Sequence, residues 1–183
     1  PLTTFNLGGG FGINYGADTP PQADEWRSTI LPLVQPLNLK IIIEPGRFIA
    51  GNSGILATTL TYVKRTPRKA FYIVDAGMND LIRPALYGAR HWVYARHEDA
   101  PRETADLVGP ICESSDFFLK AGPIPQVAPG EFLVLRSAGA YGFAMASNYN
   151  ARRRAAEVMV DGAAHRLVRT RETYDDLVRG ETV

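Results

Sequence analysis

The chain has 183 residues, with 20 Lys or Arg against 19 Asp or Glu, so its formal net charge at pH 7 is +1. This near balance provides no large field of one sign and argues against a nucleic-acid or anionic-membrane partner. The single cysteine, Cys112, excludes an intrachain disulfide and a zinc-finger cluster. Neither a signal peptide nor a bilayer-spanning stretch is recognisable, so we expect a cytoplasmic protein.

The first fifty residues predict a βαβ unit. A strand ending at Leu7 leads into a glycine cluster, and a helix follows, capped by Asp18 or Thr19 and kinked or shortened at Pro32. Residues 39–43 form a β-branched run of the kind that is buried on both faces of a parallel sheet.

Beyond residue 51 the pattern changes to short strands, which we expect over residues 55–64, 69–75, 91–96, 104–112, 131–136, 156–160 and 164–170. Thr66-Pro67-Arg68 and Asp161-Gly162 predict two hairpin turns. Helical pieces are expected around 79–87 and 138–149, and a terminal helix over 172–179 should stop at Gly180. The second part is therefore predicted to be mainly antiparallel β.

Several short motifs carry residues suited to chemistry. The glycine cluster suits a phosphate, because backbone N–H groups can approach oxygens without interference from a Cβ. Glu44 and Arg47 follow a buried strand, at the edge of a parallel sheet where ligands bind. Arg83 and Tyr87 are four apart, on one face if helical.

Each motif also has a plain structural interpretation when taken alone. The glycines fit a tight turn, Glu44 and Arg47 a local ion pair, and Arg83 and Tyr87 a solvated surface pair. A lone cysteine such as Cys112 is usually a small buried hydrophobe, but the polar residues that crowd it here also allow an accessible thiol next to carboxylates. The three histidines show no metal-ligand spacing with Cys or carboxylates, so we predict no metal site; they are His91, His97 and His165.

The order of the motifs along the chain and the residues that form them are, together, more specific than any single motif. Together they resemble the diaminopimelate decarboxylase family, pyridoxal 5′-phosphate enzymes of the alanine racemase and ornithine decarboxylase fold type. The motifs are Gly8-Gly9-Gly10-Phe11-Gly12, Glu44-Pro45-Gly46-Arg47, Arg83-Pro84-Ala85-Leu86-Tyr87-Gly88, Cys112-Glu113-Ser114 and Gly139-Ala140-Tyr141. The resemblance implies an α/β plus β fold: residues 1–51 would be the last strands of an alanine-racemase-like (β/α)8 barrel that binds the cofactor. Residues 52–183 would form a mainly antiparallel C-terminal β-barrel domain.

The resemblance also implies roles for single residues. The cofactor would be bound by Gly8, Gly9, Gly10, Glu44, Gly46, Arg47 and Tyr141, with Glu44 at the pyridine nitrogen and the glycines and Arg47 at the phosphate. The substrate, meso-diaminopimelate, would be bound by Arg47, Arg83, Tyr87, Glu113 and Tyr141. Cys112 would be the catalytic acid. In this family Cys112 and Glu113 serve the partner subunit's site, so the resemblance implies a homodimer with shared active sites.

The implied activity is decarboxylation of meso-2,6-diaminopimelate to L-lysine and CO2, the last step of lysine biosynthesis. One departure is that the family's Schiff-base lysine has no match, since none of the four lysines stands in the family's motif; they are Lys40, Lys64, Lys69 and Lys120. A whole (β/α)8 barrel needs about 250 residues. We therefore expect a C-terminal portion that is inactive alone and needs an N-terminal barrel segment, in cis or in trans.

Two other functions remain open from the sequence. One is a related decarboxylase that acts on ornithine, arginine or a carboxylated polyamine. Glu113 with the Arg83 and Tyr87 pair argues against it, since these residues favour a substrate that is charged at both ends. The other is a non-catalytic binding paralogue, which the missing lysine would fit.

Overall fold

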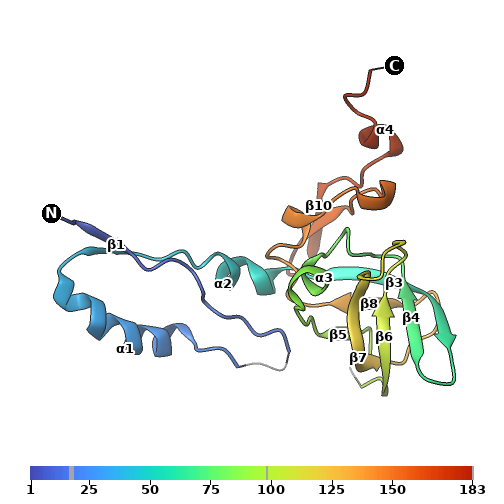
Figure 1. Cartoon of the computed structure of the whole chain (residues 1–183), viewed down its shortest axis with the longest axis horizontal. Helices are drawn as coiled ribbons and strands as arrows, with labels where there is room; N and C mark the ends of the chain where they lie inside the picture. Colours follow the sequence, from blue (N-terminus) through green and yellow to red (C-terminus); the bar gives the residue numbers. More distant parts are fainter. Residues whose placement is uncertain (17–18, 98, 183) are drawn as a thin grey trace.

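The structure is a computed structural model that describes residues 1–16, 19–97 and 99–182. Figure 1 shows an arm, residues 1–50, that extends from a body of short strands, and a hairpin that follows the body. The helices are α1 (Ala23–Val34), α2 (Gly46–Ala50), α3 (Arg83–Tyr87) and α4 (Tyr174–Leu177), with 3-10 turns η1 (Gln35–Leu37), η2 (Gly51–Ser53), η3 (Phe143–Met145) and η4 (Tyr149–Ala151). The strands are β1 (Thr4–Asn6), β2 (Lys40–Ile42), β3 (Leu56–Arg65), β4 (Ala70–Val74), β5 (Val93–Ala95), β6 (Arg102–Val108), β7 (Phe117–Pro125), β8 (Phe132–Leu135), β9 (Glu157–Asp161) and β10 (Ala164–Arg169).

The body is a six-stranded sheet with the strand order β5-β8-β3-β4-β6-β7. Neighbouring strands are antiparallel except β4 and β6, which run parallel. The sheet curls until its end strands β5 and β7 are in contact, so it forms a nearly closed barrel (Figure 1). The predicted mainly antiparallel β-barrel is thus confirmed.

An arginine side chain bridges the seam between the two end strands. Arg102 Nη2 donates to the carbonyl oxygen of Val93 in β5 at 2.9 Å, and its Nη1 donates to that of Pro123 in β7 at 3.1 Å. The guanidinium also lies over the rings of Trp92 and Tyr94, 5.1 and 5.8 Å from their centroids. Because one planar group reaches both edges, Arg102 links the two end strands through a hydrogen bond to one carbonyl oxygen of each.

The barrel encloses the hydrophobic core. Strand residues alternate between the two faces of the sheet, and those that point inward are shielded from water. The most buried core side chains are Leu60, Tyr72, Val74, Leu107, Phe118, Ile124, Leu133 and Leu135. Since each such burial contributes about 1.5–3 kcal/mol, the stability of the body comes mainly from the inside of the barrel.

The arm has the predicted βαβ order, with β1 and β2 paired in parallel. Among its described residues only Ile13 and Val34 are buried. The expected burial of residues 39–43 on both faces is wrong for this chain. Ile42 and Ile43 are 37% and 42% exposed, because β1 is the only strand that pairs with β2 among the described residues.

The start of α1 also differs from the prediction. Asp18 lies outside the described residues, and Thr19 precedes the helix without capping it. The cap is Gln22, whose backbone N–H donates to Glu25 Oε2 at 2.9 Å in a capping box. Pro32 lies inside the helix, which continues past it.

Three predictions between residues 104 and 149 differ from the structure. No strand is predicted over residues 117–125, yet β7 forms there because it pairs with β6 across a register shift. The predicted strand over 104–112 ends at Val108, where a turn begins. The predicted helix around 138–149 is wrong. Tyr141 adopts φ 63°, a left-handed conformation that interrupts a helix, and only the turns η3 and η4 form.

The last part of the chain matches its prediction. β9 and β10 form the expected antiparallel hairpin, in which Gly162 supplies a φ of 57° at the turn. α4 falls inside the predicted terminal helix, and Gly180 with φ 94° follows its end. In the part of the chain that the structure describes, no helix combines the length and apolarity needed to cross a membrane.

Candidate active site

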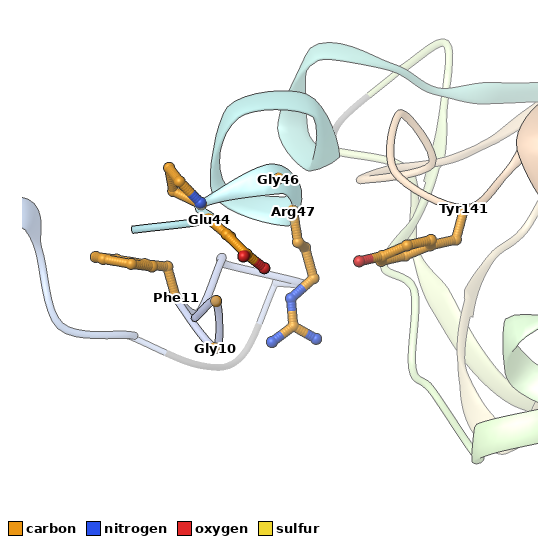
Figure 2. Close-up of a pocket in the computed structure, with 8 residues that line it drawn as sticks. Gly10, Phe11, Glu44, Gly46, Arg47 and Tyr141 are labelled. Carbon is orange, nitrogen blue, oxygen red and sulfur yellow. The ribbon is translucent and has the colours of Figure 1, made fainter. Parts of the chain in front are cut away.

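A cavity of about 390 Å³ lies where the arm meets the body. Figure 2 shows the glycine loop and the segment after β2 on one side and Tyr141 of the body on the other. The cavity is lined by Gly9, Gly10, Phe11, Glu44, Pro45, Gly46, Arg47 and Tyr141. The structure therefore brings together most of the predicted cofactor-binding residues, although Gly8 does not line the cavity.

Glu44 is held in place by the strand that leads into the glycine loop. Asn6 Nδ2 donates to Glu44 Oε1 at 2.7 Å, and Asn6 Oδ1 accepts the backbone N–H of Gly8 at 2.8 Å. The backbone N–H of Glu44 in turn donates to the carbonyl oxygen of Gly8 at 2.8 Å. One asparagine side chain thus fixes the carboxylate relative to the loop.

The glycine loop approaches Glu44 too closely for a side chain to fit. A Cβ at Gly9 would lie 2.8 Å from the carbonyl oxygen of Glu44. Gly8 and Gly10 have φ values of 72° and 89°, which residues with a Cβ rarely adopt. Main chain rather than side chain therefore forms this wall of the cavity, as phosphate binding by backbone N–H groups requires.

Arg47 and Tyr141 face the cavity from the two parts of the molecule. Arg47 lies in the first turn of α2, and its guanidinium extends beside the glycine loop (Figure 2). The Tyr141 hydroxyl points across the gap toward the side chains of Arg47 and Glu44 (Figure 2). The wall of the cavity thus offers a permanently charged guanidinium, a carboxylate and a phenol.

The loop that carries Tyr141 is hydrogen-bonded, backbone to backbone, to the segment that directly follows the arm. The N–H of Gly139 donates to Gly51 O at 3.0 Å, and that of Ala138 donates to Gly54 O at 2.8 Å. A Cβ at Gly139 would lie 2.0 Å from the carbonyl oxygen of Ala50. This contact requires glycine and sets how far Tyr141 stands from α2.

Arg83 lies behind Tyr141 in a buried cluster. Its guanidinium is 5.6 Å from the centroid of the Tyr141 ring, and its Nη1 donates to Tyr15 Oη at 2.5 Å. The Tyr15 ring meets His91 edge to face at 5.2 Å, and His91 Nδ1 is 2.8 Å from the carbonyl oxygen of Arg136. Since a carbonyl only accepts, His91 Nδ1 carries the proton and Nε2 is left as a buried acceptor.

His91 makes this cluster sensitive to acid. Burial lowers its pKa below the ordinary 6.5, and the charge of Arg83 lowers it further. Because the pKa of His91 is lower in the folded chain than in the unfolded chain, the unfolded chain binds the proton first as the pH falls below 6.5. The stability present above pH 6.5 is therefore lost as the pH falls below this value.

We therefore expect His91→Asn to reduce the loss of stability on acidification. The amide can still donate to the carbonyl oxygen of Arg136 but does not titrate. Between about pH 7.5 and about pH 5.5 the urea midpoint of this variant should fall less than that of the wild type. His165→Asn, at an exposed histidine, should behave like the wild type. An unchanged pH dependence in His91→Asn would contradict the prediction.

The remaining predicted residues stand apart from the cavity. Tyr87 ends α3 and is 64% exposed, whereas Arg83, four residues before it, is 6% exposed, so the helix does not present the two on one solvated face. Cys112 and Glu113 are exposed in the turn between β6 and β7. In the described part of the chain no group of three His, Cys, Asp or Glu side chains is arranged to hold a metal ion.

Sequence reasoning missed the residues that support the site. Asn6 binds Glu44 and Tyr15 binds Arg83, each distant in sequence, and His91 packs on Tyr15; none of the three supporting residues stands in a motif. Asn6 offered one local signal, a short polar side chain just before a glycine cluster, which is typical of a turn. Tyr15 and His91 offered none.

Comparison with known proteins identifies relatives over nearly the whole chain. The diaminopimelate decarboxylase of Pseudomonas aeruginosa is 50% identical over 180 residues, which are 98% of this chain and 43% of that protein. That of Aquifex aeolicus is 47% identical over 176 residues, 95% of this chain and 42% of that protein. The chain thus spans less than half the length of these relatives.

Solved structures agree in fold. The diaminopimelate decarboxylase of Helicobacter pylori, complexed with L-lysine, superposes with a TM-score of 0.88 at 42% identity over 97% of this chain and 44% of that one. The diaminopimelate decarboxylase of m. jannaschi superposes with a TM-score of 0.92 at 35% identity, over 99% of this chain and 43% of that one. Residues 17–139 also match the family of the pyridoxal-dependent decarboxylase C-terminal sheet domain. The chain therefore belongs to the pyridoxal-dependent decarboxylases, and it contains their C-terminal sheet domain.

Proposed function

We propose that this chain is the C-terminal portion of a diaminopimelate decarboxylase, which releases CO2 from meso-2,6-diaminopimelate to give L-lysine in the cytoplasm. The observation that carries the proposal is the cavity, where the glycine loop, Glu44, Arg47 and Tyr141 converge from both parts of the molecule. Residues 1–51 would complete a cofactor-binding (β/α)8 barrel, and residues 52–183 would form the β-domain. The high identity to diaminopimelate decarboxylases over nearly the whole chain supports this assignment.

The cavity fits pyridoxal 5′-phosphate in its donor set and its shape. The glycine wall, which a Cβ at Gly9 would disrupt, suits the phosphate, and the guanidinium of Arg47 supplies a fixed positive charge. Glu44, oriented by Asn6, would hold a proton on the pyridine nitrogen. When bound, the cofactor supplies an electron-accepting ring that stabilises the negative charge left at carbon when CO2 departs.

The substrate would be recognised by residues of the β-domain. Arg83 offers a planar guanidinium that suits the distal carboxylate, and Tyr87 stands exposed at the end of the same helix. Glu113 would bind the distal amino group, and Cys112 would deliver the proton. Because Cys112 and Glu113 are exposed and do not line the cavity, a homodimer in which they complete the partner's site accounts for their place.

The arm supports the need for a further barrel segment. Parallel strands are normally covered on both faces, yet β1 and β2 form a two-stranded sheet whose apolar side chains are partly exposed. The exposed large apolar residues of the arm are Leu2, Phe5, Leu31, Leu33, Leu37, Ile42, Ile43, Phe48 and Ile49. All four lysines are among the described residues and none lines the cavity, so the segment that covers this surface would also supply the cofactor's lysine.

The test is substrate preference in a completed enzyme. We would fuse the chain to the part of the Pseudomonas aeruginosa relative that it does not match and measure CO2 and lysine released from meso-diaminopimelate. We expect one lysine per CO2 and a turnover of ornithine that is slower by a factor of about 100 or more. A site built to bind a distal carboxylate rejects a substrate that lacks this group. Preference for ornithine would overturn the assignment. Cofactor binding without CO2 release from either substrate would favour a non-catalytic paralogue.

The related decarboxylase is the second candidate function, and the comparisons disfavour it. The lysine/ornithine decarboxylase of Vibrio vulnificus, solved with cadaverine, superposes with a TM-score of 0.74 at 25% identity over 84% of this chain. This is a weaker match than the diaminopimelate decarboxylases give.

A further inference from the structure

Asp116 is a buried carboxylate outside the cavity, and it joins two turns at one edge of the barrel. It lies at the end of the turn that carries Cys112 and Glu113, and it is only 5% exposed. Its Oδ2 accepts the backbone N–H of Ile111 in the same turn at 2.6 Å. Its Oδ1 accepts the backbone N–H of Met78, in the turn after β4, at 2.7 Å.

The surroundings are shaped for this carboxylate. A Cβ at Gly109 would lie 2.5 and 2.6 Å from the two carboxylate oxygens, so only glycine fits there. The N–H of Gly109 donates to Asp116 O at 3.2 Å, and the N–H of Asp116 donates to Glu113 O at 3.0 Å. Burial raises the pKa of Asp116, and the N–H groups of Ile111 and Met78, together with the positive charge of Arg152, oppose that rise. Burying a charged carboxylate costs free energy even when backbone N–H groups bind it, which is consistent with a specific structural role for Asp116.

The second turn leads directly to Arg83 and Tyr87. It runs from the end of β4 through Met78 to α3, and Thr58 of β3 anchors its start by donating to Asp75 Oδ1 at 2.6 Å. The two turns lie at the same edge because β4 and β6, which precede them, are parallel neighbours. Asp116 is therefore a direct link between the turn of Cys112 and the turn that precedes α3.

We propose that Asp116 is a positioning residue that holds the Cys112–Glu113 turn at a fixed spacing from the loop that leads to Arg83 and Tyr87. The proposal deepens the proposed function and rests on it only for what these groups contact. In the dimer, one carboxylate would then set where a protomer presents Cys112 and Glu113 to its partner, relative to its own Arg83.

The first experiment measures amide hydrogen exchange in the 183-residue chain. In the wild type, the amides of Met78 and Ile111 should exchange more slowly than the amide of Ser114, which lies in the same turn as Ile111. Asp116→Asn should speed exchange at Met78 and Ile111 by about tenfold or more, because an amide group provides one uncharged acceptor oxygen in place of two oxygens that share a negative charge.

Asp106→Asn is the matched control, since Asp106 is another buried carboxylate whose Oδ1 accepts a backbone N–H, that of Ala121 at 2.8 Å. This variant should speed exchange at Ala121 and leave Met78 and Ile111 unchanged. Unchanged exchange at Met78 and Ile111 in a folded Asp116→Asn chain would overturn the proposal. If that variant does not fold, wild-type amides of Met78 and Ile111 that exchange as fast as that of Ser114 would overturn it equally.

The second experiment reads the position of the thiol. Because Cys112 is the single cysteine, alkylation by iodoacetamide reports on this turn alone. We expect the alkylation rate to rise several-fold in Asp116→Asn and to stay at the wild-type value in Asp106→Asn; equal rates in all three chains would count against a positioning role.

In the fused enzyme, Asp116→Asn should raise KM for meso-diaminopimelate more than it lowers kcat. A fused wild type that releases no CO2 would refute the proposed function, while exchange and alkylation would still decide the role of Asp116.

Discussion

Replacing Glu44 by glutamine is expected to lower kcat of the completed enzyme by about 100-fold or more, while pyridoxal 5′-phosphate binding weakens far less. Removing one preorganised electrostatic partner from a closed site typically costs this much in rate. Glutamine keeps the size of the side chain and can still hydrogen-bond Asn6, but it cannot stabilise a proton on the pyridine nitrogen. Binding should persist because the glycine loop and Arg47, which would hold the phosphate, are unchanged.

The measurement pairs CO2 release with the fluorescence of bound cofactor. Glu25→Gln is the matched control, since Glu25 belongs to the same arm but caps α1 and does not line the cavity. It should leave kcat within about twofold of the wild type, as surface substitutions usually do. A Glu44→Gln enzyme with wild-type kcat would show that the carboxylate does not act on the cofactor.

Gly139→Ala should have the largest effect on the fold at the site. The added Cβ would lie 2.0 Å from the carbonyl oxygen of Ala50 and 2.8 Å from the nitrogen of Gly54, and neither is a side-chain atom that can rotate away. Overpacking of this kind costs about 2–3 kcal/mol. For a chain of this size the melting temperature should fall by about 5–10 °C. The cavity should widen as well, because Tyr141 follows Gly139 closely in the same loop.

Thermal melting followed by circular dichroism tests this prediction. Gly46→Ala is the matched control, since a Cβ there meets nothing within 4 Å and the position lies in α2. Its melting temperature should stay within about 2 °C of the wild type, because alanine is tolerated in a helix at least as well as glycine. Equal melting temperatures for the two variants would mean that the loop of Tyr141 can move away from α2 without cost.

The parts of the fold that were predictable rest on local signals. The hairpin of β9 and β10 follows from Asp161-Gly162, and the βαβ order of the arm follows from a glycine cluster before a helix and a β-branched run after it. The strand β7 was not predictable, because Gly122 and Pro123 interrupt its alternation and only its pairing with β6 makes it a strand. The helix expected around 138–149 failed because Tyr141 adopts a left-handed conformation, which interrupts a helix.

The site divides in the same way. Glu44, Arg47 and Tyr141 could be named because they stand in motifs whose order resembles a family. Asp116 stands beside such a motif, but the positioning role proposed for it depends on its hydrogen bond to Met78, 38 residues away in sequence. Contacts of this range follow from the parallel placement of β4 and β6, which no local pattern shows.

The bridge that Arg102 makes across the barrel seam bears on aggregation. An open strand edge presents unpaired N–H and C=O groups to any other chain, and in the body Arg102 donates to one carbonyl oxygen of each end strand and so joins the two edges. The edges of β1, β2 and the hairpin have no such cover in the described structure, and exposed apolar side chains accompany them, among them Phe5, Ile42 and Val160. Strand-to-strand association of the isolated chain should therefore begin at the arm and the hairpin, while the barrel resists it.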